Sequence, residues 1–325
     1  MQNQPKGLQK RKQLFDKFSG QLSLLKEKGL IHEDLKYEQT YICPICLEQF
    51  SESALQEDPK QNFLTLEDAP PDSLGGSKIA LTCKLCNNGC GRTIDFHLTE
   101  VLREIDASYF YKGFSRRGTI DFEGQRLQVE LTSLGNGTLQ AYHRTKLNNP
   151  TLLDRFIYGI KNKTVSPLIN FSPPKSRVDS KRVNYALLKS NYIIAFAKFG
   201  YIFLLDAAYN SLRQQLLKPD THTFPWAPFI KDQFTSAQTG TYYLHNNGLK
   251  SIFNVFALKT EYSETLIGGL IPQPSLSFEE LGKRVDAGKD HDDTIIFDTT
   301  IYDPAVNLFS DYNEIRKVHN WVYKA

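Results

Sequence analysis

Two short cysteine motifs, CPIC at residues 43–46 and CKLC at residues 83–86, bracket the stretch that decides the fold of this 325-residue chain. Between them lie LTLEDAPP at 64–71 and SLGG at 73–76, and the second motif continues into two asparagines at 87–88. A CxxC pair forms a tight turn that directs both sulfur atoms to one point, and two such turns supply the four thiolates of a tetrahedral zinc shell. We therefore predict a structural zinc site, with the ligands Cys43, Cys46, Cys83 and Cys86.

Unrelated buried cysteines and redox chemistry both fit this spacing less well than zinc does. Four of the five cysteines fall into the two CxxC pairs, which unrelated buried cysteines rarely do. A single CxxC pair can be a redox motif, but two pairs in one segment favour a metal. Cys90 is left over, because four thiolates already close a zinc shell.

The residues between the cysteine motifs predict a β-hairpin that leads into a helix. Residues 63–67 have the character of a short strand, and residues 78–82 that of the strand which returns. The prolines at 70–71 force a turn between them. A helix is predicted from Asn87 onward, with an interruption near residues 89–91.

The order of these motifs resembles the HNH endonuclease family, in its zinc-bearing ββα-metal form. In that family a CxxC turn precedes a strand that ends in an acidic residue and a His. A Pro, a Gly-Gly turn and a second CxxC follow, and the second CxxC leads straight into Asn or His on a short helix. This chain has Glu67-Asp68, the prolines at 70–71, the glycines at 75–76 and Asn87 in that order, within about residues 41–105.

The resemblance implies a nuclease that hydrolyses phosphodiester bonds in DNA with a divalent cation. Such a cation binds the scissile phosphate and offsets the charge of the leaving oxygen. Hard oxygen ligands suit Mg²⁺ or Mn²⁺ at that position. By resemblance, Glu67 at the end of the strand and Asn87 at the start of the helix would hold this cation.

The general base is where the chain departs from the family. Asp68 stands at the position of the usual His, and an Asp has an ordinary pKa of about 3.9, against about 6.5 for His. Asp68 is therefore a good base only if its pKa is raised, but it could also orient the water or bind the metal. His97 is the only His in this region and is either a replacement base or metal ligand, or lies on the helix exterior with Asp95 as a cap or surface residue.

The composition is that of a globular chain with no strong charge bias. The net charge is +3, so any nucleic-acid binding has to depend on local basic patches. We find no apolar run of the roughly 18–20 residues that span a membrane, and no apolar leader segment with a cleavage site. Paired thiols that bind zinc suit a reducing compartment, so we expect a cytoplasmic protein without membrane association.

We predict an α+β fold in three parts. These are an N-terminal amphipathic helix in residues 1–40, a small zinc-stabilised HNH-like module in 41–107, and a larger mixed α/β C-terminal domain in 108–325. The helix at 8–28 has an apolar stripe and a basic first half, which is either a solvated face or an arm that contacts phosphates. Residues 183–217 are apolar nearly all round, which is typical of one or two long buried helices and predicts the core of the C-terminal domain.

Three functions remain open at this level. The first is a metal-dependent HNH-type endonuclease that acts on DNA, in a defence or mobile-element context. The second is a catalytically degenerate HNH-like module that binds nucleic acid or a protein partner, which the Asp68 departure favours. The third is a zinc-stabilised interaction protein with no role in nucleic-acid binding, which the modest net charge allows.

Overall fold

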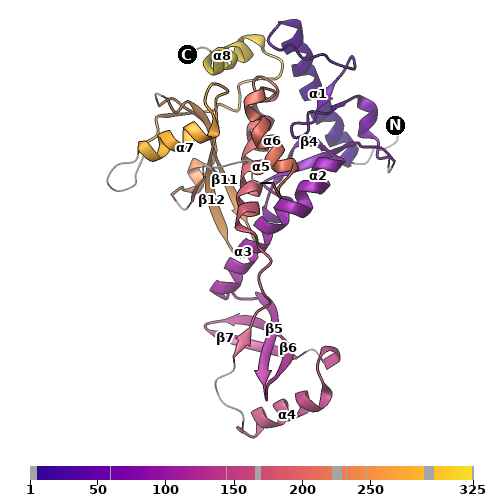
Figure 1. The fold of residues 1–325 in the computed structure, drawn as a ribbon, viewed down its shortest axis with the longest axis vertical. Helices are drawn as coiled ribbons and strands as arrows, with labels where there is room; N and C mark the ends of the chain where they lie inside the picture. Colours follow the sequence, from indigo (N-terminus) through magenta and orange to yellow (C-terminus); the bar gives the residue numbers. More distant parts are fainter. Residues whose placement is uncertain are drawn as a thin grey trace. The chain divides into compact units, whose positions relative to one another are not determined.

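The protein is a mixed α+β structure whose described sheets are all antiparallel, which confirms the predicted fold class at this level. It is seen in a computed structural model (Figure 1). The structure describes residues 6–58, 60–143, 145–164, 170–221, 229–231, 233–246, 248–288 and 296–323. Among the helices of these residues, none combines the length and the apolar character needed to cross a bilayer.

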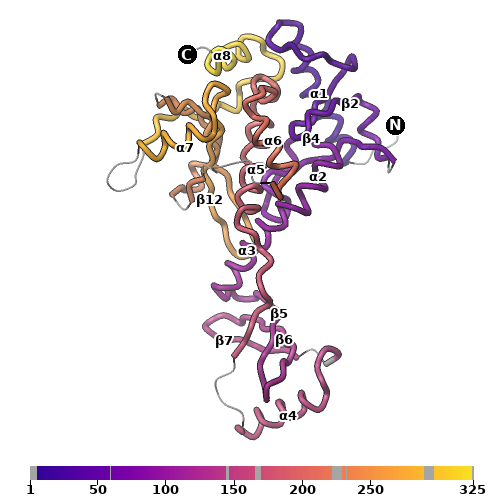
Figure 2. The backbone as a smooth tube through the Cα atoms, in the orientation of Figure 1, coloured from indigo at the N-terminus to yellow at the C-terminus, as the bar shows by residue number. Residues whose placement is uncertain are grey.

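The chain divides into two compact units, and the division differs from the predicted one. One unit joins residues 1–99 to residues 179–325, and the other consists of residues 100–178. Figure 2 shows the indigo N-terminal segment and the yellow C-terminal segment in the same unit. The predicted boundaries at 40 and 107 followed changes in composition, whereas the observed units follow long-range packing that composition does not reveal.

Helix α5 (Ser180–Phe199) explains why the first unit includes both ends of the chain. It contacts β3 and β4 of the cysteine segment and also β11 and β12 of the C-terminal sheet (Figure 1). Its side chains are buried on nearly every face, as the sequence predicted. The helix therefore belongs to a core that the cysteine segment shares, and not to a separate C-terminal domain.

Helix α1 (Lys6–Glu27) packs on the same core and confirms the helix predicted at residues 8–28. Its apolar stripe is buried, and the ring of Phe18 stacks on Phe196 of α5 with centroids 4.6 Å apart. Fully burying an aromatic or aliphatic side chain contributes roughly 1.5–3 kcal/mol, so this stripe fixes α1 in place. The stripe consists of Leu14, Phe18, Leu22 and Leu25.

The predicted hairpin and helix of the cysteine segment are present. Strands β3 (Leu64–Ala69) and β4 (Ser77–Cys83) pair, and the chain continues into α2 (Lys84–Cys90). A Cβ on Gly76 would lie 1.5 Å from the Pro70 carbonyl oxygen, so the hairpin turn requires glycine there. The predicted interruption is a π-helical turn at Gly91–Asp95, after which α3 (Phe96–Tyr109) continues.

The C-terminal part of the first unit is a five-stranded sheet in the order β13-β10-β11-β12-β9. The sheet packs on α5, where Asn254 Nδ2 of β11 donates to Asn191 Oδ1 at 2.7 Å. Elements of the sheet are β9 (Phe229–Lys231), β10 (Gly240–Leu244), β11 (Ser251–Lys259), β12 (Glu264–Pro272) and β13 (Thr299–Ile301). Helices α7 (Phe278–Ala287) and α8 (Tyr312–Tyr323) complete the unit.

Helix α5 ends at a glycine and α6 (Asn210–Leu217) begins ten residues later, so the segment predicted as one helix or two contains two. Gly200 has a φ of +59°, and a Cβ there would lie 1.9 Å from Gln21 Oε1. The side chain of Gln21 uses the space, because its Oε1 accepts the Tyr201 N–H at 2.8 Å and its Nε2 donates to Phe199 O at 3.0 Å. This buried amide joins α1 to the end of α5.

The second unit contains a four-stranded antiparallel sheet in the strand order β7-β6-β5-β8, together with α4 (Pro150–Lys161) and most of α3. The strands are β5 (Ser115–Phe122), β6 (Gln125–Gly135), β7 (Thr138–His143) and β8 (Phe171–Ser172). The core between sheet and helix consists of Ile120, Leu127, Val129, Leu152, Leu153 and Phe156.

Candidate metal centre

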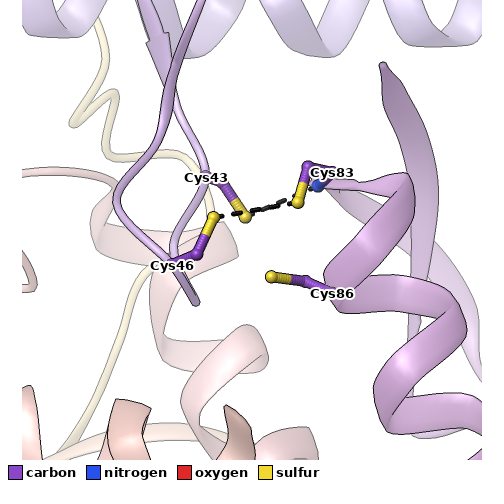
Figure 3. A group of neighbouring side chains, drawn as sticks. All are labelled: Cys43, Cys46, Cys83 and Cys86. Carbon is purple, nitrogen blue, oxygen red and sulfur yellow. Dashed lines mark hydrogen bonds between the residues drawn. The ribbon is translucent and has the colours of Figure 1, made fainter. Parts of the chain in front are cut away.

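The four predicted zinc ligands converge on one point (Figure 3). Cys43 and Cys46 lie in the turn between β1 (Tyr41–Ile42) and β2 (Gln49–Phe50), and Cys83 and Cys86 lie where β4 passes into α2. The first turn is closed by hydrogen bonds from Cys43 N–H to Glu48 O and from Leu47 N–H to Cys43 O, both 2.9 Å. The second begins at a strand end and continues into the first turn of a helix.

Buried tyrosines fix the position of the first turn. Tyr41 Oη donates to Leu81 O at 2.6 Å, which fastens the turn to β4. Tyr201 Oη donates to Ile42 O at 2.8 Å, and Tyr192 Oη donates to Pro44 O at 2.9 Å. The phenols are buried and supply the partners that the backbone of a short turn would otherwise lack.

The spacing of the sulfur atoms fits a zinc ion. All four Sγ atoms lie within 4.8 Å of one another, and Cys46 Sγ is 3.7 Å from Cys83 Sγ. Zn–S bonds of about 2.3 Å in a tetrahedron place sulfur atoms about 3.8 Å apart. A disulfide would need about 2.05 Å, and the cysteines are all free. The backbone N–H of Cys83 also points at Cys43 Sγ at 3.4 Å.

The electrostatics of the cluster also call for a cation. Burial raises the pKa of the Cys43 thiol well above its ordinary value. Four clustered sulfurs could ionise together only if a positive ion lay among them, and metal binding supplies that charge. The four cysteines could therefore hold a metal ion such as zinc. Cys90 is buried outside this group, with its Sγ 3.9 Å from Leu216 O.

A second charged cluster lies beside the same hairpin. Glu67 Oε1 is 2.6 Å from Lys189 Nζ of α5, and the two side chains are only 2% and 3% exposed. Glu67 Oε2 accepts a hydrogen bond from Thr82 Oγ1 at 2.6 Å. The same ammonium contacts Asp95 Oδ2 at 2.6 Å. Glu67, Lys189 and Asp95 are hereafter the buried carboxylate cluster.

Lys189 is held as a cation by its two carboxylate neighbours. Burial alone would lower the pKa of this lysine, but Glu67 and Asp95 raise it above its ordinary value. Charged residues are almost never fully buried unless they are paired, and here the pairing comes from two segments of the chain that are distant in sequence. The interaction connects α5 to β3 and to the π-helical turn.

The predicted catalytic cation does not fit Glu67 in this arrangement. Both carboxylate oxygens already have partners, Lys189 and Thr82. A divalent ion at Glu67 would have to displace the Lys189 ammonium and leave that charge in the core, which costs several kcal/mol per ion. In this arrangement the cation that contacts Glu67 is the ammonium of Lys189.

Asp68 lies at a bulge, because the β3–β4 register shifts between Glu67 and Asp68. Its Oδ1 is buried and has no hydrogen-bond partner among the described residues. Burial, with further contributions from Asp72 and Glu67, raises the pKa of Asp68, while Lys78 and Lys189 oppose the rise. A raised pKa is what an Asp needs to accept a proton in place of His.

Asn87 lies one helical turn from the hairpin. Its Nδ2 donates to Thr65 Oγ1 and to Leu66 O, both at 2.9 Å. These bonds fasten α2 to β3 immediately before Glu67. Asn87 thus contacts the two residues of β3 that precede Glu67, and a metal-ligand role for Asn87 stays a prediction.

His97 contacts the start of α5, whereas Asp95 belongs to the buried carboxylate cluster. His97 Nδ1 accepts the backbone N–H of Asp179 at 3.1 Å, at the start of α5. Its role as a replacement base or ligand stays a prediction. The sequence suggested that Asp95 is a cap or a surface residue. It is neither, since its side chain is 14% exposed and contacts Lys189.

Lys189 was not predicted from the sequence. The signal was present, because this lysine lies in a helix that is apolar nearly all round, and such a charge must find a buried partner. What the sequence did not contain was which carboxylate would meet it. Comparisons with protein-family models, curated proteins and solved structures found no match.

Proposed function

We propose that this chain is a zinc-stapled, HNH-like module that binds nucleic acid, DNA in the first place, without cutting it. The observation that carries this proposal is the 2.6 Å contact between Lys189 Nζ and Glu67 Oε1 in the core. A nuclease of this type needs its acidic residue open to a hydrated cation and a phosphate. Here that residue has a permanent ammonium partner instead.

The scaffold side of the proposal has separate support. The hairpin, the helix that follows it and the four converging cysteines stand in the order that the resemblance implies. A structural zinc in the cysteine site would hold the hairpin end and the helix start together. The proposed module would keep this architecture and lose the catalytic cation.

Basic side chains near the hairpin support the nucleic-acid side of the proposal. In the basic half of α1, Arg11 pairs with Glu57 and Lys12 with Glu52 and Asp16. Lys10 and Lys17 of the same helix have no ion pair among the described residues and remain able to meet a phosphate. Part of the predicted phosphate-contacting arm is thus already neutralised, and part is not.

The competing function is the predicted DNA endonuclease, which one observation favours. The pKa of Asp68 is raised and its Oδ1 has no hydrogen-bond partner among the described residues, as a substitute general base would require. For this function Lys189 would have to leave Glu67. A defence or mobile-element role would follow from the nuclease activity.

One experiment separates the two functions. Zinc-loaded protein would be incubated with supercoiled plasmid in the presence of Mg²⁺ or Mn²⁺, and binding to a labelled DNA duplex would be followed by fluorescence anisotropy. We expect salt-sensitive binding and no nicking. Nicking that requires the added cation and is lost in Glu67→Gln, but not in the exposed control Glu279→Gln, would establish the nuclease instead.

A further inference from the structure

A cavity of about 530 Å³ lies in the first unit, between α1, β4, α5 and the segment before α8. This volume is within the range of small-molecule sites. Its charged lining consists of lysines from three elements, and no carboxylate is among the described residues that line it. These are Lys10 and Lys17 of α1, Lys78 of β4 and Lys198 of α5.

Two of these lysines lie over aromatic rings that also line the cavity. Lys17 Nζ is 3.7 Å from the centroid of the Phe309 ring, and Lys198 Nζ is 5.7 Å from that of Tyr302. Lys17 Nζ also lies 3.4 Å from Ala197 O. Cation–π contacts of this kind limit the freedom of a lysine without neutralising its charge.

Carboxylates close to the cavity in sequence are engaged elsewhere. Asp16 pairs with Lys12 at 2.9 Å, and Asp303 Oδ1 accepts the Ala305 N–H at 2.8 Å. Asp68 lies opposite Lys78 in the hairpin register and interacts with it electrostatically, but no ion pair joins them among the described residues. The cavity therefore combines several positive charges with few counter-charges.

The charges also act on one another. Crowding by neighbouring atoms, together with Lys198 and Lys10, lowers the pKa of Lys17 to about 8. An anion in the cavity would relieve this repulsion. Five aliphatic side chains also line the cavity and are hereafter called its apolar floor: Leu14, Ile79, Ile194, Ala197 and Val306.

We propose that this cavity binds a nucleotide, with its phosphate on Lys17 and Lys198 and its base against the apolar floor. Lys ammonium groups bind phosphate as point charges, and a base adds a planar face that packs on apolar side chains. The nucleotide is either free or part of a single DNA strand. In the second case the inference deepens the proposed function and depends on it.

The test uses the full zinc-loaded chain and two probes. A fluorescein-labelled oligo-dT strand is followed by anisotropy, and unlabelled dTMP and inorganic phosphate are followed by calorimetry. The variants are Lys17→Met and Lys198→Met, with Lys283→Met as the matched control, because Lys283 of α7 is 73% exposed and remote from the lining residues. Circular dichroism and zinc content verify that each variant is folded.

We expect each cavity variant to weaken binding of the responding probe about tenfold, and the control to leave it unchanged. For the strand, each removed lysine should also lower the slope of log K against log salt by about 0.7. If only the oligo-dT strand binds through these lysines, the ligand is a nucleotide within a DNA strand. If dTMP binds through them, the ligand is a free nucleotide.

Failure of the nucleotide cavity and failure of the proposed function give different results. If the strand binds but neither cavity variant weakens it, the nucleotide cavity is wrong and the nucleic-acid proposal survives. If dTMP binds through the two lysines and no nucleic acid binds, the cavity is right and the proposed function is wrong. Binding of inorganic phosphate that matches binding of dTMP would contradict the assignment of a base to the floor.

A pH titration gives a second readout for the same site. Because the folded pKa of Lys17 is about 8, its charge is present below that pH and is lost above it. Binding of the responding probe should therefore weaken between about pH 7 and pH 9, and this step should disappear in Lys17→Met. A step that persists in Lys17→Met would contradict the role of this lysine.

Discussion

The β3–β4 hairpin contributes to two clusters of acidic side chains that differ in whether the chain itself provides a cation. At one end Cys83 lies with three other cysteines in a group that consists of sulfur donors only. Farther along β3, Glu67 contacts Lys189, and Lys189 also contacts Asp95 of the π-helical turn. The first cluster could hold an ion from outside the chain, whereas the second includes its own cation, the ammonium of Lys189.

The difference shows how a metal site can be judged from a structure. Residue type alone makes Glu67 as good a candidate for a metal ligand as the cysteines. The decisive observation is which groups surround each candidate ligand. Glu67 has an ammonium at 2.6 Å, whereas the four cysteine Sγ atoms lie within 4.8 Å of one another and include no cationic group. The same hairpin therefore carries one candidate metal centre and one carboxylate whose cation partner is a lysine of the chain.

The largest effect should follow loss of the external ion. Structural zinc sites in peptides have apparent binding free energies of about 10–16 kcal/mol, comparable with the whole stability of a domain. Cys83→Ser should therefore abolish zinc binding and the cooperative unfolding transition, as measured by zinc analysis and thermal denaturation. Cys90→Ala is the control, because this cysteine lies outside the group; loss of zinc in the control alone would contradict the assignment.

The internal cation should give the next largest effect. Lys189→Met leaves Glu67 and Asp95 buried without a counter-charge, and breaking a buried pair costs about 3–5 kcal/mol. Urea denaturation would measure the loss while zinc content stays unchanged. The exposed pair of Lys283 and Glu279 provides the control, since Lys283→Met should leave stability nearly unchanged.

Removing all three charges at once sharpens this comparison. The triple variant Glu67→Gln, Asp95→Asn and Lys189→Met should recover much of the stability that Lys189→Met loses, because no unpaired buried charge remains. The recovery, measured by the same denaturation, would be about 2 kcal/mol or more. A triple variant as unstable as Lys189→Met would show that shape, and not charge, determines the contribution of this cluster.

The smallest effect concerns Asp68. Its pKa is raised in the folded protein, so the fold favours the protonated form and loses stability as pH rises through the folded pKa. Asp68→Asn should therefore raise stability slightly at neutral pH, and by less at low pH. Thermal denaturation at several pH values would measure this; a loss of stability at neutral pH would contradict it.

The sequence was sufficient for local features whose causes are local. The CxxC spacing predicted the four converging sulfurs, and the stripe that includes Phe18 and Leu22 predicted the buried face of α1. The helix α7 was not predicted, although Ser277 and Glu280 form a capping box that marks its start.

Long-range partners are the part that the sequence could not provide. Lys189 is distant in sequence from Glu67, and Lys78 of β4 is distant from Lys198 of α5, which shares its cavity. The predicted domain boundaries differ from the observed units for the same reason, because α5 packs on strands from both ends of the chain. Only the folded arrangement decides whether a predicted ligand is free to bind an ion.

The most direct test of this account is a Mn²⁺ titration of the zinc-loaded protein, followed by electron paramagnetic resonance. We predict about one zinc per chain at the cysteines and a Mn²⁺ spectrum that remains that of the free ion, because Lys189 occupies the carboxylate cluster. Stoichiometric Mn²⁺ binding that is lost in Glu67→Gln would contradict the central claim and restore the nuclease.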